Sequence, residues 1–118
     1  MKDIEIKLEN DHITKDSGIR GFVEVNYTGK FDSIVINAQI LGSSELVTYT
    51  TCNNKQLPHT VSRLFISKES MMENKAEFTA VINFEPKESH DIKFRVSIIE
   101  QHKAVSYTHL TLPTILLV

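Results

Sequence analysis

Apolar and polar residues alternate with a period of two along most of this chain, and this pattern constrains the fold more than any other feature. Successive side chains of a β-strand point to opposite faces, so an alternating run has one apolar face and one wet face. Antiparallel sheets with one solvated face show this pattern. Five strong runs lie at residues 3–8, 23–27, 33–41, 77–85 and 91–98, and two weaker runs lie at 46–51 and 61–67.

The segments between these runs contain turn-forming residues. Asp16-Ser17-Gly18 and Thr28-Gly29-Lys30 favour turns, because glycine tolerates positive φ and Asp and Ser bond their own backbone. Since Thr28-Gly29-Lys30 lies between two strong runs, it predicts a hairpin of the second and third strands. We expect residues 52–58 to form a polar loop, and only residues 68–75 suggest a helix.

Seven short strands separated by turns every ~8–12 residues predict a sandwich or a barrel. A single sheet would leave its apolar face in water, whereas two sheets packed face to face bury the alternating aliphatic residues in a shared core. We therefore expect an all-β fold, a seven-stranded antiparallel β-sandwich. The centre of its core is expected to contain Ile36, Phe78, Phe84, Phe94 and Val96.

Composition and charge argue against several classes of function. The net charge of -2 and the scattered Lys and Arg residues leave no basic excess that would attract nucleic acid or an anionic membrane. No window of ~20 apolar residues could span a bilayer, and the N-terminal residues lack the apolar run of a secretory signal. Cys52 is the only cysteine, so no intrachain disulfide can form, which fits a reducing compartment. These features predict a cytoplasmic protein with no transmembrane segment and no nucleic-acid partner.

The sequence contains no arrangement that indicates a catalytic, cofactor or metal site. No pair of histidines has the i, i+4 spacing of a zinc-binding helix, and Cys52 has no evident base that would make it a nucleophile. Adjacent acid–histidine pairs such as His90-Asp91 point to opposite faces of a strand. We therefore expect no catalytic residue, no cofactor and no metal. The histidines are His12, His59, His90, His102 and His109; of the acidic residues, Glu45, Asp91 and Glu100 fall in unrelated elements, and Asp16 and Asp32 are expected to cap turns.

Two features suit the binding of a partner. The wet strand faces carry hydroxyls and amides, and an edge strand can accept an extended peptide as an additional strand. Taken singly, each of these residues fits an ordinary solvated sheet face better than a binding site. The residues are Asn37, Gln39, Thr48, Thr50 and Thr51.

Residues 105–118 differ in character from the rest of the chain. They closely resemble a peptide that recurs where library adapter sequence is translated at the end of an assembled sequence. We therefore expect residues 1–104 to form the domain, as the first part of a longer protein, and residues 105–118 to be a non-native tail. The alternative is an additional strand, because Leu110 and Leu112 alternate with polar residues.

The order of features over residues 3–100 resembles the N-terminal domain of the arrestin-like superfamily. The opening strand at residues 4–8 and the Ser17-Gly18 turn precede residues 21–25, which are similar to the family's Gly-x-Val-x-Val strand. The later runs follow in the family's order: a strand ending near Gly at 34–42, an aromatic strand closing on proline at 78–86, and a strand with an aromatic residue and valine at 92–98. The aromatic residue that often follows Gly42 is missing, and the phosphate-sensing basic cluster of receptor-binding arrestins has no match.

This resemblance implies an immunoglobulin-like sandwich of the arrestin N-terminal type, acting as a non-catalytic adaptor or scaffold that binds a protein partner. Two alternatives stay open. One is an immunoglobulin- or fibronectin-like sandwich module of a larger adhesion protein or enzyme, since a fold alone does not determine function. The other is a small-molecule carrier or a β-sandwich enzyme, for which a deep polar pocket would be the mark.

Overall fold

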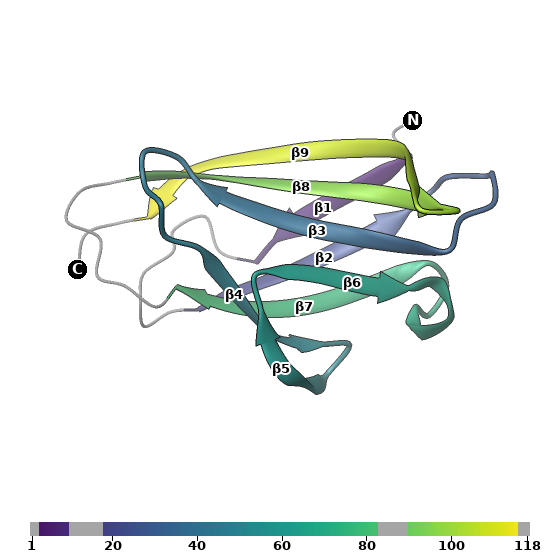
Figure 1. The fold of residues 1–118 in the computed structure, drawn as a ribbon, viewed down its shortest axis with the longest axis horizontal. Helices are drawn as coiled ribbons and strands as arrows, with labels where there is room; N and C mark the ends of the chain where they lie inside the picture. Colours follow the sequence, from purple (N-terminus) through teal and green to yellow (C-terminus); the bar gives the residue numbers. More distant parts are fainter. Residues whose placement is uncertain (1–2, 10–17, 83–89, 116–118) are drawn as a thin grey trace.

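The computed structural model describes residues 3–9, 18–82 and 90–115 and contains two antiparallel β-sheets packed face to face (Figure 1). Sheet A has the strand order β1-β2-β7-β4-β5, and sheet B has the order β6-β3-β8-β9. The predicted all-β sandwich is confirmed, but the described residues form nine strands instead of seven. The strands are β1 Ile4–Leu8, β2 Ile19–Val25, β3 Ser33–Ile40, β4 Val47–Cys52, β5 Lys55–Val61, β6 Arg63–Ser67, β7 Lys75–Ile82, β8 His90–Glu100 and β9 Lys103–Ile115.

The core lies between the two sheets and is built from alternate residues of each strand. Phe78 of sheet A is at its centre, with its ring centroid 5.6 Å from that of Tyr49 and 6.3 Å from that of Phe94 in sheet B. Fully burying a side chain of this size contributes ~1.5–3 kcal/mol. The predicted core positions Ile36, Phe78, Phe94 and Val96 are all completely buried, and Phe84 lies outside the described residues.

The predicted hairpin of the second and third strands is wrong, because β2 and β3 belong to different sheets. β2 pairs with β1 and β7, whereas β3 pairs with β6 and β8. Phe31, in the connection between them, is only 5% exposed and anchors this segment in the core. A tight turn at Thr28-Gly29-Lys30 would leave that ring in water, so burial of the ring outweighs the local turn chemistry.

Residues 52–58 do not form the predicted loop but contain a tight β4–β5 turn and the first part of β5. Asn53 and Asn54 have φ angles of 51° and 66°. Two successive positive φ values mark a type I′ hairpin turn, and asparagine adopts this conformation more readily than most residues. Pro58 is tolerated because β5 is an edge strand of sheet A.

The helix suggested at residues 68–75 is reduced to a single 3-10 turn, η1, at Lys68–Ser70. The chain then enters β7 through a second positive-φ turn at Glu73-Asn74, and a third such turn, at Gln101-His102, joins β8 to β9. The Oδ2 atom of Asp32 accepts a hydrogen bond of 2.8 Å from the backbone N–H of Gln101. Asp32 therefore caps the β8–β9 turn, although it is distant from this turn in the sequence.

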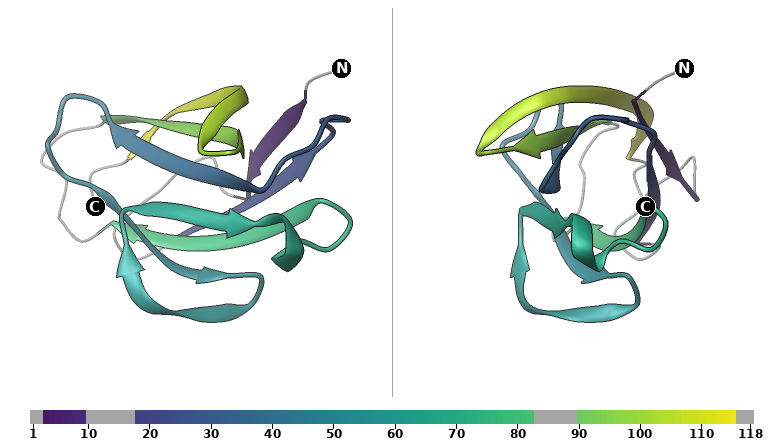
Figure 2. Two further views of the ribbon diagram at one scale, coloured as in Figure 1. Left: turned by 45° about the vertical axis from the view of Figure 1, so that its right-hand side comes forward. Right: turned by 90° about the vertical axis from the view of Figure 1, so that its right-hand side faces the viewer.

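β9 runs antiparallel to β8 over Lys103–Ile115 and so includes most of residues 105–118. The structure thus has the additional strand that was the alternative for this segment. Ser106 Oγ donates a hydrogen bond of 2.8 Å to Asp3 Oδ2 beside β1, which links the edges of the two sheets. The non-native origin of residues 105–118 stays a prediction. Sequencing the 3′ end of the gene tests it. β9 lies along the top of the molecule and the β4–β5 hairpin at the bottom, on the opposite side, in the views of Figures 1 and 2.

Candidate binding surface

The residues considered for catalysis do not converge in the described part of the chain. Cys52 is partly buried at the end of β4, and burial raises the pKa of its thiol, which disfavours the reactive thiolate. No group of three or more His, Cys, Asp or Glu side chains that could hold a metal ion occurs among the described residues. Of the histidines, His59 and His102 are exposed on β5 and on the β8–β9 turn; His12 and the side chains of His90 and His109 lie outside the described part. Of the acidic residues, Glu45 and Asp91 are exposed and Glu100 is half-buried, while Asp16 lies outside that part.

A β-bulge organises the threonines of β4. The register between β4 and β7 shifts between Tyr49 and Thr51, so that both Thr50 and Thr51 reach Thr79. The Thr50 and Thr79 hydroxyl oxygens are 2.9 Å apart, and the Thr51 hydroxyl also bonds that of Thr79. Because these hydroxyls are engaged with one another, the cluster is better explained as support for the bulge than as a ligand site.

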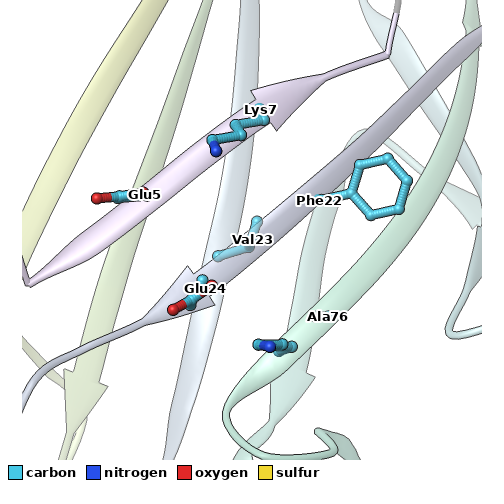
Figure 3. A pocket seen from close by; sticks show the side chains of 7 residues that line it. Glu5, Lys7, Phe22, Val23, Glu24 and Ala76 are labelled. Carbon is cyan, nitrogen blue, oxygen red and sulfur yellow. The ribbon is translucent and has the colours of Figure 1, made fainter.

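The outer face of sheet A has a hollow of about 520 Å³ between the β4–β5 turn and the turn that precedes β7. Phe22 and Met72, which are 41% and 81% exposed, form its apolar part. An adjoining hollow of about 130 Å³ shares Phe22 and extends to Glu5 and Lys7 of β1 (Figure 3). We call this region the Phe22 surface; it consists of Phe22, Met72 and the surrounding charged residues Glu5, Lys7, Lys75 and Glu77.

Phe22 points outward because β2 alternates strictly between buried and exposed positions. The carbon Cζ of the Arg20 guanidinium lies 5.4 Å from the centroid of the Phe22 ring. Arg20 is held by ion pairs of 3.0 Å to Glu77 and 3.5 Å to Glu9. The hydrogen bond that Arg20 donates to Glu77 raises the pKa of Arg20, so its charge is retained. Arg20 therefore covers part of the ring through a cation–π contact, and the rest of the ring stays accessible.

Asn53 fixes the rim of the larger hollow through three hydrogen bonds. Its side-chain Nδ2 donates to the backbone oxygen of Ser70 at 2.9 Å, and its Oδ1 accepts from the backbone N–H of Glu77 at 2.9 Å. Its own backbone N–H donates to the Glu77 oxygen at 2.8 Å. The β4–β5 turn is thus tied to η1 and β7, which gives the hollow a fixed shape on that side.

The Phe22 surface was not predicted from the sequence. The available signal was Phe22 itself, because it occupies an outward position of an alternating strand where a polar residue is expected. Met72 and Asn53 fell in segments without periodicity, so only the fold brings them near Phe22. Aromatic residues and methionine are enriched at protein interfaces, and methionine adapts its shape to a partner. An apolar centre with a charged rim therefore suits contact with another protein.

Comparisons with known proteins find similarity in structure only. No protein-family model and no curated protein matches the chain. The structure is similar to that of the Salmonella SafD adhesin, with a TM-score of 0.57 and 13% identity over 99% of this chain and 100% of that chain. It also matches the human F-spondin reeler domain (fragment 1), with a TM-score of 0.44 and 8% identity over 93% of this chain and 89% of that chain. The first likeness shows the fold alone, and the second is too remote to support an argument.

Within the described residues, no helix has the length and apolar character needed to cross a membrane.

Proposed function

We propose that the chain is a non-catalytic, protein-binding β-sandwich module of a larger adhesion protein and that it contacts its partner through the Phe22 surface. The adhesion context comes from the structural likeness to the SafD adhesin over 99% of the chain, and the observation that carries the contact is the exposure of Phe22 and Met72. The exposed apolar pair at the Phe22 surface supplies a place for the contact.

The energetics of the Phe22 surface support a binding role. Fully burying a side chain the size of Phe or Met contributes ~1.5–3 kcal/mol. Phe22 and Met72 are far from fully buried in the chain alone, so a partner that covers them gains part of this free energy. The charged residues around them match the polar rim of protein interfaces, where complementary charges set specificity and orientation.

The strand order supports an immunoglobulin-like type for the sandwich. Constant-type immunoglobulin domains have strands A-B-E-D in one sheet and C-F-G in the other. Here β1-β2-β7-β4 and β3-β8-β9 take those places in chain order, with β5 and β6 added at the free edges of the two sheets. Such modules occur in many cell-surface proteins.

Substitution of the two exposed apolar residues tests the role of the Phe22 surface. The immobilised chain is incubated with an extract of its source organism, and retained proteins are quantified for the wild type and for the double variant Phe22→Ser, Met72→Ser. Leu46→Ser is the matched control, because Leu46 is 56% exposed and lies outside the surface. We expect the retained partner to be lost with the double variant and kept with the control. Equal retention by the double variant would refute the proposal.

An arrestin-like adaptor is the second candidate. It rests on the sequence resemblance over residues 3–100; two of the runs that carry it lie on β2 and β7, which are neighbours in sheet A, with residues 21–24 paired to residues 75–78. An adaptor of this type acts in the cytoplasm, whereas an adhesion module acts at the cell surface. The location of the tagged full-length gene product, measured by cell fractionation, separates the two candidates.

A further inference from the structure

The outer face of sheet B carries three cationic side chains. Lys93 and Arg95 on β8 occupy outward positions between neighbours that are fully buried in the core, and Arg63, exposed, begins β6 just before the buried Leu64. Asn37 on β3 lies directly opposite both Arg63 and Arg95, and Gln39 lies directly opposite Lys93. These five residues form what we call the cationic face.

No carboxylate neutralises these cations in the part of the chain that the structure describes. The ion pairs found there join Arg20 to Glu9 and Glu77 on the other sheet. Asp91 is also exposed on β8, but it forms no ion pair with Lys93 among the described contacts. Since the whole chain has a net charge of -2, this local positive charge is not a consequence of general basicity.

Aromatic rings lie beside the two guanidinium groups. The Cζ atom of Arg63 is 5.3 Å from the ring centroid of Phe65, and that of Arg95 is 4.5 Å from the centroid of Tyr107. Phe65 is 62% exposed. Stacking on a ring leaves the N–H donors at the edge of the guanidinium available to an anion. Tyr107 belongs to residues 105–118, whereas Arg63, Lys93 and Arg95 all lie outside that segment.

A hollow of about 240 Å³ lies over β3 and β8 and is lined by Asn37, Ala38, Gln39, Lys93 and Arg95. Lysine and arginine carry only donors, and the amide nitrogens of Asn and Gln add further N–H groups. Charge-assisted hydrogen bonds from such donors to carboxylates are stronger than neutral ones. The chemistry of the hollow therefore favours carboxylate groups.

The spacing of the cations matches an extended chain. Lys93 and Arg95 are alternate residues of one strand, so their Cα atoms are separated by about 6.8 Å along it. Alternate side chains of an extended peptide have the same separation, and Arg63 lies two strands from Arg95, at about 10 Å. We infer that the cationic face binds an extended acidic segment of a partner protein, with carboxylates at alternate positions facing Lys93 and Arg95. This site lies on the opposite sheet from the Phe22 surface and does not depend on it.

Peptide binding to the full chain tests this inference. A labelled ten-residue peptide of alternating Glu and Ser is titrated at low ionic strength, and the same peptide with Gln in place of Glu is the reference. We expect only the Glu peptide to bind, and its affinity to fall as salt shortens the Debye length from ~10 Å at 0.1 M to ~3 Å at 1 M. Lys93→Gln and Arg95→Gln should each weaken binding roughly two- to fivefold, as expected for exposed ion pairs.

The control variant is Lys30→Gln, which removes one exposed positive charge from the β2–β3 connection, outside both surfaces, and it should leave the affinity unchanged. Circular dichroism verifies that each variant is folded. The inference is overturned if the Glu and Gln peptides bind equally, if neither binds, or if Lys30→Gln weakens binding as much as Arg95→Gln. Tighter binding of a single-stranded DNA of equal charge would also overturn it, because the partner would then be a nucleic acid.

Discussion

Phe78 lies directly opposite Gly21 in sheet A, and its ring occupies the space in which a side chain at residue 21 would stand. A Cβ atom added to Gly21 would overlap the ring of Phe78 and lie 2.9 Å from Cδ2 of Leu8. Only glycine leaves Phe78 free to pack against both Tyr49 and Phe94. Gly21 is therefore a packing requirement of the core, and the constraint does not come from its φ angle.

Gly21→Ala tests this relationship. We expect a loss of ~1–3 kcal/mol in the free energy of unfolding, because overpacking a dense core forces side chains away from preferred rotamers. Urea denaturation measures the loss, and Ser44→Ala at an exposed position is the control. A change within 0.5 kcal/mol, about that of an ordinary surface substitution, would show that the ring does not cover residue 21.

Tyr49 offers a second test, because its hydroxyl is buried without a hydrogen-bond partner among the described residues. Leaving a buried polar group unsatisfied costs ~1–3 kcal/mol, so Tyr49→Phe should leave stability unchanged or raise it. Thermal and urea denaturation at pH 7 measure the effect. A loss above ~1 kcal/mol would mean that the hydroxyl makes a hydrogen bond that stabilises the fold.

The same residue predicts a dependence on pH. Burial raises the pKa of the Tyr49 phenol above its value in the unfolded chain. The unfolded chain therefore loses this proton first, from about pH 10, and stability falls as the pH rises further. Tyr49→Phe lacks this contribution, so its stability relative to the wild type should increase between about pH 9 and pH 11. Parallel curves for the two proteins would contradict the burial of Tyr49.

The β4–β5 turn gives a further prediction through Asn53, whose side chain makes two of the three hydrogen bonds at the rim of the Phe22 surface. Asn53→Gly keeps the positive φ but removes these two bonds, and it should cost ~1–2 kcal/mol of unfolding free energy. Asn54→Gly, at the neighbouring position with φ 66°, is the matched control and should be neutral or stabilising. If the two variants have the same free energy of unfolding in urea denaturation, Asn53 contributes its positive-φ backbone conformation, and its side-chain hydrogen bonds add no stability.

The sequence was sufficient to predict which strand residues face the core, because alternation is a local property. Ile36, Phe78, Phe94 and Val96 were identified in this way, and all are buried. Strand pairing could not be predicted in the same way, because it depends on contacts between distant segments. Phe31 shows the difference: its burial carries the β2–β3 connection across to the other sheet, although the adjacent residues favour a hairpin turn.

The candidate surfaces were predicted less completely than the core. Asn37 and Gln39 were recognised as polar strand residues, but the cations beside them come from β6 and β8, which pair with β3 only in the folded sheet. Met72 and Asn53 lie in segments without periodicity, so nothing in the sequence placed them near Phe22. Sites assembled from several strands depend on register, and a two-residue pattern does not determine which strands are neighbours.

The central claim is the assignment of faces, since both proposed surfaces require that the outward residues of each sheet are accessible to a partner. Two phenylalanines of sheet B test it directly: Phe94 is completely buried and Phe65 is 62% exposed. We predict by urea denaturation that Phe94→Ala lowers the free energy of unfolding by ~3–5 kcal/mol, while Phe65→Ala changes it by no more than ~0.5 kcal/mol. Similar losses for the two variants, or a loss under ~1 kcal/mol for Phe94→Ala, would contradict the assignment.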